Sequence, residues 1–109
     1  MAIDIDQYVC NEHVVCNGTV YLSGFLDNRG YLYDIRVTHQ RIILSSKSYV
    51  QVWPLKRIVW VELCFNDRLN MWEIGFRLIC ETSCHYIYVS QFDWANTLFN
   101  NIQYYSVFN

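Results

Sequence analysis

The residues of this chain that could do chemistry are five cysteines and three histidines, and one short segment combines both types. Cys80 and Cys84 are four positions apart and His85 follows directly, which suits half of a zinc site or a disulfide across a hairpin. Structural zinc needs four ligands, usually in two closely spaced pairs, and Cys10 and Cys16 are too far apart to supply the second pair. We therefore expect no metal and no cofactor, and interpret the strand cysteines as small apolar side chains.

A catalytic site would need more than a cysteine near a histidine, because a third group must orient the base. The sequence contains no nucleophile signature, no glycine-rich phosphate loop and no paired-acid motif. We therefore expect that the protein is not an enzyme and has no catalytic residues.

The charged residues are few and scattered. The formal net charge is −2, and Lys56 with Arg57 is the only adjacent basic pair among eight basic residues. Nucleic-acid binders concentrate Lys and Arg against phosphates, so we expect no nucleic-acid partner. Arg29, Arg36 and Arg41 could form one basic spot for an anionic lipid headgroup, and ordinary solvated charge is the alternative interpretation.

Aromatic residues are abundant, at 17% of a chain that is 53% hydrophobic. A domain of roughly 100 residues buries only about two-thirds of its unfolded surface, so part of this apolar surplus stays outside as a candidate contact surface. Simple packing of these side chains, under the helix or the N-terminal arm, is the alternative interpretation. The candidate protein-interface residues are Tyr31, Tyr33, Trp53, Trp60, Tyr86 and Tyr88.

The elements that must position these side chains are mostly strands. Alternating apolar residues separated by turn residues predict seven of them, at residues 14–23, 31–37, 41–45, 49–53, 58–65, 72–80 and 85–89. Gly18 is expected to mark a bulge in the first strand. Pro54 cannot donate to a sheet, so it should end a strand or lie on a sheet edge.

The C-terminal segment is predicted to be an amphipathic helix. Ser90 and Asp93 fit the capping box of a first helical turn. Apolar side chains then recur every three or four residues and should cover a sheet face. These residues are Trp94, Ala95, Leu98, Phe99, Ile102 and Tyr105.

The length of 109 residues predicts one domain, with a core at residues 14–105 and an N-terminal arm at residues 1–12. The arm has two acids and no basic residue before an apolar run, so it does not read as a secretory signal. An odd number of cysteines favours reduced thiols and a cytoplasmic location. Apolar runs are too short for a transmembrane segment.

Three segments resemble motifs of the pleckstrin-homology-like (PH-like) superfold, in its GRAM and small bacterial PH branches. Residues 30–33 resemble the GRAM opening strand, residues 37–45 its T-x-x-R hairpin, and residues 53–62 its I-P-L-x-x-I-x-x-V-E segment. The resemblance implies a mainly β fold, a seven-stranded antiparallel, partly open barrel capped by one C-terminal helix.

Members of this superfold bind phosphoinositide headgroups, peptides or other domains, and they are seldom enzymes. The lipid-binding branch carries a Lys and an Arg-x-Arg around its first loop. Here that region offers Arg29 and Arg36 beside Asp27 and Asp34, and no lysine precedes Lys47. A multiply charged phosphate needs several converging cations, which this region lacks.

Three functional hypotheses follow. The first is a protein-interaction or adaptor module that binds a protein partner, or its own copy, through an aromatic sheet face or a strand edge. The second is a peripheral membrane module that binds anionic lipid headgroups. The third is a small viral or phage accessory protein that docks on and blocks a host factor.

Overall fold

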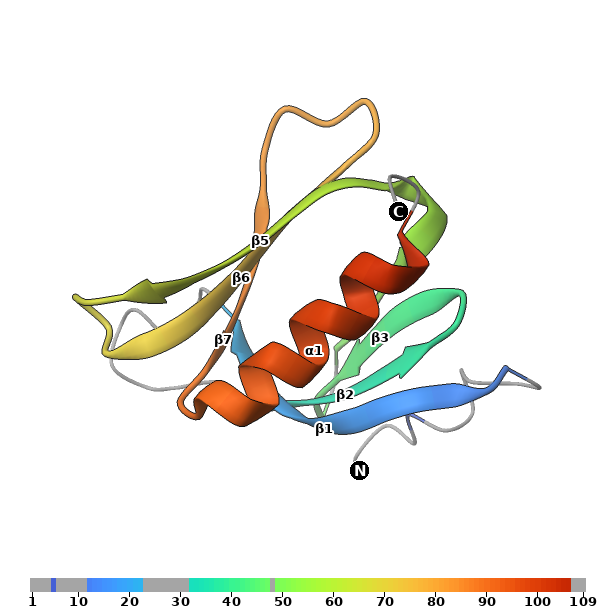
Figure 1. Ribbon diagram of the computed structural model, residues 1–109. Coiled ribbons are helices and arrows are strands. Elements are labelled where there is room, and N and C mark those ends of the chain that lie inside the picture. Colours follow the sequence, from blue (N-terminus) through green and yellow to red (C-terminus); the bar gives the residue numbers. More distant parts are fainter. Residues whose placement is uncertain (1–4, 6–11, 23–31, 48, 107–109) are drawn as a thin grey trace.

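Seven antiparallel strands followed by one α-helix make up the described part of the chain, which confirms the predicted fold class (Figure 1). The computed structural model describes residue 5 and residues 12–22, 32–47 and 49–106. The elements are β1 (Val14–Leu22), β2 (Leu32–Thr38), β3 (Arg41–Ser45), β4 (Val50–Pro54), a short 3-10 helix η3 (Leu55–Arg57), β5 (Ile58–Asn66), β6 (Met71–Leu78), β7 (His85–Val89) and α1 (Phe92–Tyr105).

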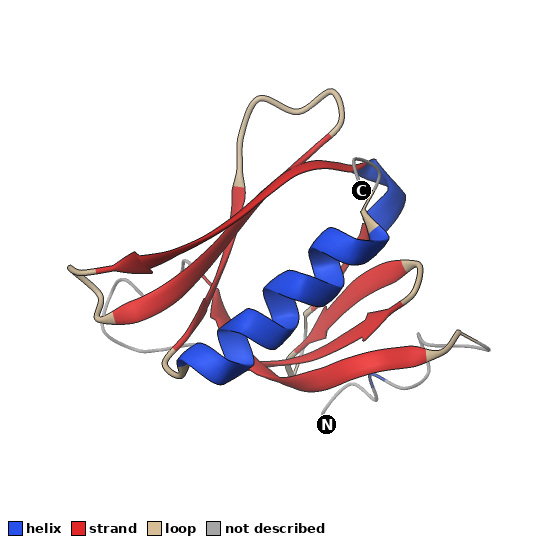
Figure 2. Cartoon of the chain, in the orientation of Figure 1, coloured by secondary structure: helices blue, strands red, loops and turns tan. Residues whose placement is uncertain are grey.

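The strands form one sheet in the order β4-β3-β2-β1-β7-β6-β5. β1 joins its two halves, because it pairs with β2 from Val14 to Tyr21 and also with β7 at Tyr21 and Leu22. The sheet therefore curls, and α1 lies diagonally across its concave side (Figure 2). We call the face toward α1 the inner face and the opposite one the outer face.

The core fills the space between the inner face and α1. Ile74 and Phe76 of β6 are fully buried, as the alternation in this strand predicts. From the helix, Ala95, Leu98 and Ile102 are fully buried at the predicted spacing. Burying one large aliphatic or aromatic side chain contributes about 1.5–3 kcal/mol, so this packing holds the helix on the sheet.

The predicted capping box at the start of α1 is wrong. The helix begins at Phe92, and its N-cap residue is Gln91, which makes no side-chain capping bond. Ser90 therefore lies one position too early to cap the first turn. Asp93 still lies in the first turn, where a carboxylate interacts favourably with the helix dipole.

Three expectations about single residues have different outcomes. Pro54 ends β4 at a sheet edge, as predicted. Gly18 is not a bulge: it pairs regularly with Ile35, and the irregularity in β1 lies between Val14 and Cys16. Cys80 was expected to continue the β6 strand, but β6 ends at Leu78.

A second, smaller apolar cluster lies on the outer face of β3. Ile43 is fully buried there by Ile5 of the N-terminal region, with Val14 and Val52 packed alongside. This part of the outer face is thus closed within the chain. Among the helical segments that the structure describes, none has the length and apolar character needed to cross a membrane.

Candidate functional site

The six predicted interface aromatics are distributed between the core and the surface. Tyr31 lies outside the described residues. Tyr33 is half-buried and makes an edge-to-face contact with the exposed Tyr49, at 5.7 Å between ring centroids. The other four, Trp53, Trp60, Tyr86 and Tyr88, lie on β4, β5 and β7.

Trp53 is a core residue. Its side chain is only 5% exposed and faces inward from β4. The ring makes an edge-to-face contact with Phe76 at 4.9 Å and a tilted contact with His85 at 5.2 Å. Trp53 therefore packs β4 against β6 and β7. Its burial in the folded chain leaves almost none of its side chain accessible to a binding partner.

The rings of Trp60 and Tyr86 both lie on the outer face next to Gly75. A Cβ atom at Gly75 would lie 2.9 Å from Cε1 of Tyr86 and 3.5 Å from Cζ3 of Trp60. The absence of a side chain at this position lets the Tyr86 ring lie against the strand, whereas the distance to Trp60 is that of an ordinary van der Waals contact. Tyr86 is 37% exposed and Trp60 is half-buried. We call Trp60, Gly75 and Tyr86 the aromatic platform.

Tyr88 extends the platform but is itself buried, at 6% exposure. Its ring stacks on Tyr86 with centroids 6.5 Å apart. Burial raises the pKa of Tyr88 to about 12, and a hydrogen bond to the Glu73 carboxylate adds to the effect. The Tyr88 side chain therefore stays neutral and supports the exposed ring of Tyr86.

Two carboxylates share the outer face with the platform. Glu62 lies directly opposite Gly75 and is exposed. Glu73 accepts hydrogen bonds from the Asn66 amide at 3.2 Å and from the Cys64 thiol at 3.5 Å. Burial and then the neighbouring Glu73 raise the pKa of Cys64, so its thiol is a poor nucleophile at neutral pH.

A second aromatic cluster, which the sequence reasoning missed, lies where the β5–β6 hairpin passes the start of α1. The Trp72 ring contacts Phe65 at 5.0 Å and Phe92 at 4.8 Å, and Phe65 and Phe92 are 41% and 46% exposed. Phe65 and Phe92 fit the apolar pattern of their elements, so the pattern alone places them in the core. The β5–β6 hairpin, which carries Phe65 near its turn, extends beyond the start of α1 (Figure 1).

The structure describes two of the three arginines of the predicted basic spot, Arg36 and Arg41. Arg29 lies outside the described residues, and Arg36 donates to the carbonyl oxygen of Ile35 at 3.2 Å. Arg41 forms an ion pair with Glu12 at 2.6 Å. The positive charge of Arg41 is thus neutralised within the chain.

The Glu12 carboxylate is held ionised by its surroundings. Burial alone would raise its pKa, but hydrogen bonds from Thr38 and Arg41 outweigh burial and lower it. The Thr38 hydroxyl donates to Glu12 at 2.6 Å. This contact ties the N-terminal region to the turn between β2 and β3.

The cysteine–histidine segment lies at the turn between β6 and β7. His85 Nε2 lies 2.8 Å from Glu81, and the His85 ring stacks on Phe76 inside the curled sheet. Cys80 lies in the turn after β6 with φ 67°, and Cys80 and Cys84 are free thiols. Within residues 12–22, 32–47 and 49–106, no group of three or more His, Cys, Asp or Glu side chains could hold a metal ion.

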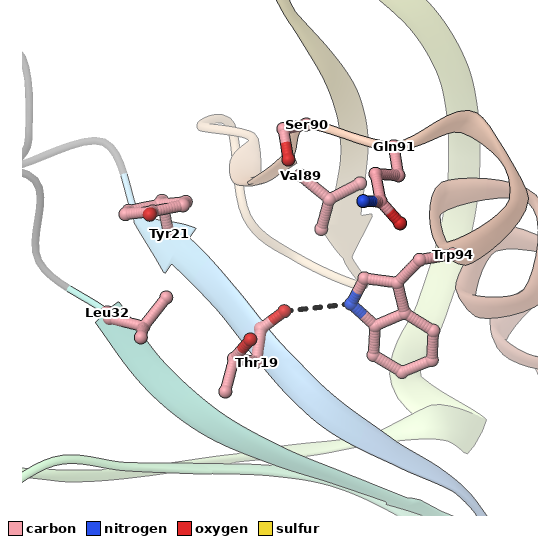
Figure 3. A pocket seen from close by; sticks show the side chains of 7 residues that line it. All are labelled: Thr19, Tyr21, Leu32, Val89, Ser90, Gln91 and Trp94. Carbon is pink, nitrogen blue, oxygen red and sulfur yellow. Dashed lines mark hydrogen bonds between the residues drawn. The ribbon is translucent and has the colours of Figure 1, made fainter.

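A pocket of about 310 Å³ opens where β1, β2 and the start of α1 meet (Figure 3). Trp94 lies along one wall, where its Nε1 donates to the carbonyl oxygen of Thr19 at 2.8 Å. Ligand sites of known proteins span about 300–1,000 Å³ and are mostly apolar, whereas this small pocket has a mixed lining. We therefore interpret the pocket as a gap at the packing interface between α1 and β1, and not as a ligand site. Its lining residues are Thr19, Tyr21, Leu32, Val89, Ser90, Gln91 and Trp94.

No protein-family model matches this chain, and no curated protein is significantly similar to it in sequence. Seven antiparallel strands with a C-terminal helix are compatible with a PH-like fold. The topology thus supports the resemblance at the level of the fold.

Among the surfaces described above, the outer face of β5, β6 and β7 is the best candidate for a functional surface, because it carries the aromatic platform.

Proposed function

We propose that this protein is a non-enzymatic, cytoplasmic interaction module of the GRAM branch of the PH-like superfold, and that it binds a protein partner on the outer face of β5, β6 and β7. The observation that carries the proposal is the aromatic platform. Trp60 and Tyr86 both lie next to Gly75, on the face that α1 leaves uncovered. Tyr and Trp supply large contact area at little entropic cost and are enriched among the residues that dominate binding energy.

The aromatic platform also packs against a buried side chain of the same strand. The buried Tyr88 stacks on Tyr86, and its hydroxyl is fixed by Glu73, so the exposed ring is held in place before a partner arrives. Binding to a rigid surface loses less conformational entropy than binding to a mobile one. The platform rings are neutral, so affinity should change little with ionic strength. An anionic-lipid module would instead release its ligand as salt is added.

The test begins with affinity purification from the native cell, using the whole chain as bait and mass spectrometry to identify the partner. Titration of the purified partner then compares the wild-type chain with Trp60→Ala and Tyr86→Ala. We expect each substitution to weaken binding by roughly 30-fold, the loss typical of a central interface aromatic. Unchanged affinity for both variants would refute the aromatic-face proposal.

The matched control is Tyr104→Ala. Tyr104 is the most exposed large apolar residue of the described chain, at 67%, but it lies on α1 and not on the outer face. Its removal should leave the partner's affinity unchanged. Circular dichroism of each variant separates a lost contact from a lost fold.

A further inference from the structure

Strand edges without a neighbouring strand in the described chain include those of β4, β1 and β5, and the first two are protected. β4 is short and ends at Pro54, which has no N–H, and the carbonyl oxygen of Val52 accepts a bond from the Gln51 side chain at 3.3 Å. On β1, the carbonyl oxygen of Thr19 is taken by Trp94. Proteins protect exposed edges in this way because free edges recruit other strands.

The third edge, along the second half of β5, carries one exposed charge, Glu62, but neither of the devices found on β4 and β1. Its bulge lies earlier, between Ile58 and Trp60, and residues 62–66 contain no lysine and no proline. In the part of the chain that the structure describes, the backbone of residues 62–66 bonds only to β6. Glu62, Cys64 and Phe65 are exposed along this stretch. Figure 1 shows that the β5–β6 hairpin extends past α1 here.

We propose that this edge is a self-association site, at which residues 62–66 of β5 pair antiparallel with the same residues of a second copy. The two-fold axis passes at Cys64, so that Cys64 lies opposite Cys64 of the second copy. A two-fold contact of this kind requires a surface that is complementary to itself.

The side-chain pattern around Cys64 meets that requirement. On the outer face, Glu62 lies opposite Asn66 of the second copy, so no like charges face each other. On the inner face, Leu63 lies opposite Phe65 of the second copy, and both are incompletely buried in the single chain. Facing apolar pairs stabilise a sheet by about 0.2–1 kcal/mol each, and opposed like charges destabilise it.

Neighbouring registers fit less well. An axis at Glu62 would place two carboxylates directly opposite each other. An axis at Leu63 would extend the pairing to Trp60, next to the bulge that interrupts the edge. The Cys64 register pairs all five residues from 62 to 66 and stays clear of the bulge.

The pairing would join the two β5–β7 halves into one continuous sheet. Because an axis perpendicular to the sheet keeps the outer faces on the same side, the dimer would carry two aromatic platforms side by side. This inference stands apart from the proposed partner binding: loss of Trp60 or Tyr86 leaves the β5 edge intact.

The first test is light scattering of the full chain over a range of concentrations. We expect a concentration-dependent dimer that Cys64→Lys weakens by roughly tenfold or more, because two lysines would then face each other at the axis. The control Asn100→Lys adds the same charge to an exposed position of α1 and should leave the dimer intact. A wild-type chain that stays monomeric at high micromolar concentration would overturn the proposal.

The second test reads the register directly. Opposed residues of antiparallel strands have Cα atoms about 4.5–5.5 Å apart, within the span of a disulfide. Diamide, which takes two electrons and two protons from two thiols, should therefore link Cys64 to Cys64 of the second copy. The reaction is run at alkaline pH because the pKa of this thiol is raised.

Cys64→Ser should abolish the covalent dimer and preserve the one seen by light scattering. Cys16→Ser and Cys84→Ser should retain the covalent dimer. A dimer that forms no Cys64 cross-link and resists Cys64→Lys would show that another surface is used, and would refute the β5 contact. Thermal unfolding of Cys64→Lys checks that its monomer is folded.

Discussion

The indole Nε1 of Trp94 donates a hydrogen bond of 2.8 Å to the carbonyl oxygen of Thr19, and this bond attaches the first turn of α1 to β1 (Figure 3). The same indole lies against Gly18, where an added Cβ would approach Trp94 Cζ2 to 2.5 Å. Such a distance is too short for two carbon atoms, so the close approach of helix and strand depends on glycine at this position.

The first prediction concerns this contact. Gly18→Ala should lower the free energy of unfolding by about 1–3 kcal/mol, because the ring of Trp94 must move away and the helix with it. Denaturant unfolding followed by circular dichroism measures the change. Asn17→Ala, at the exposed neighbouring position, is the control and should stay within about 0.5 kcal/mol of wild type. A Gly18→Ala chain as stable as wild type would contradict the proposed role of the glycine.

The second prediction concerns the helix–sheet core. Leu98 is a residue of α1 whose side chain is fully buried between the helix and the sheet. Leu98→Ala should therefore lower the free energy of unfolding by about 2–5 kcal/mol, through lost burial and the cavity left behind. Asn100→Ala, on the exposed side of the same helix, should have little effect. Equal stability of the two variants would mean that α1 does not pack as described.

The third prediction concerns acid stability. The pKa of Glu12 in the folded chain is lowered from its ordinary value of 4.5, so its ionised form stabilises the fold above about pH 4.5. That contribution should be lost as the pH falls through the lowered value. Glu12→Gln should therefore make the stability less dependent on pH in this acid range, as measured by urea unfolding at several pH values. An unchanged pH profile would argue against the Glu12–Arg41 contact.

The fourth prediction concerns alkaline stability. The pKa of Tyr88 rises from 10.0 to about 12 on folding, so its neutral form stabilises the folded chain. This contribution is present below pH 10 and should be lost as the pH rises toward about 12. Tyr88→Phe cannot ionise at this position and should reduce the loss, which thermal unfolding between these pH values would reveal. If the variant loses stability as steeply as wild type, Tyr88 ionises freely in the folded chain.

Much of the fold could be predicted from the sequence because it follows local periods. In β6, alternate residues point to one face whatever the strand packs against, so Ile74 and Phe76 could be assigned to the core. The three- and four-residue spacing of Ala95, Leu98 and Ile102 likewise defines one helix face. The helix start was misplaced because a short capping motif is compatible with more than one first turn.

The binding surface depends on contacts between strands that are distant in sequence. Trp53 and Tyr86 are both aromatic residues on predicted strands. The sequence around each does not show which of the two side chains is buried and which is exposed. Trp53 is buried because curling brings β4 against Phe76 and His85, and Tyr86 is exposed because none of the described elements covers it.

The sequence by itself thus determined the seven strands, the helix and much of the core, since periodicity is a property of each segment alone. Only the tertiary structure decided which aromatic rings lie next to Gly75, which arginine is neutralised by Glu12, and which strand edge stays open. Those outcomes depend on strand order and curvature, which are set by the packing of the whole chain and leave no local signature.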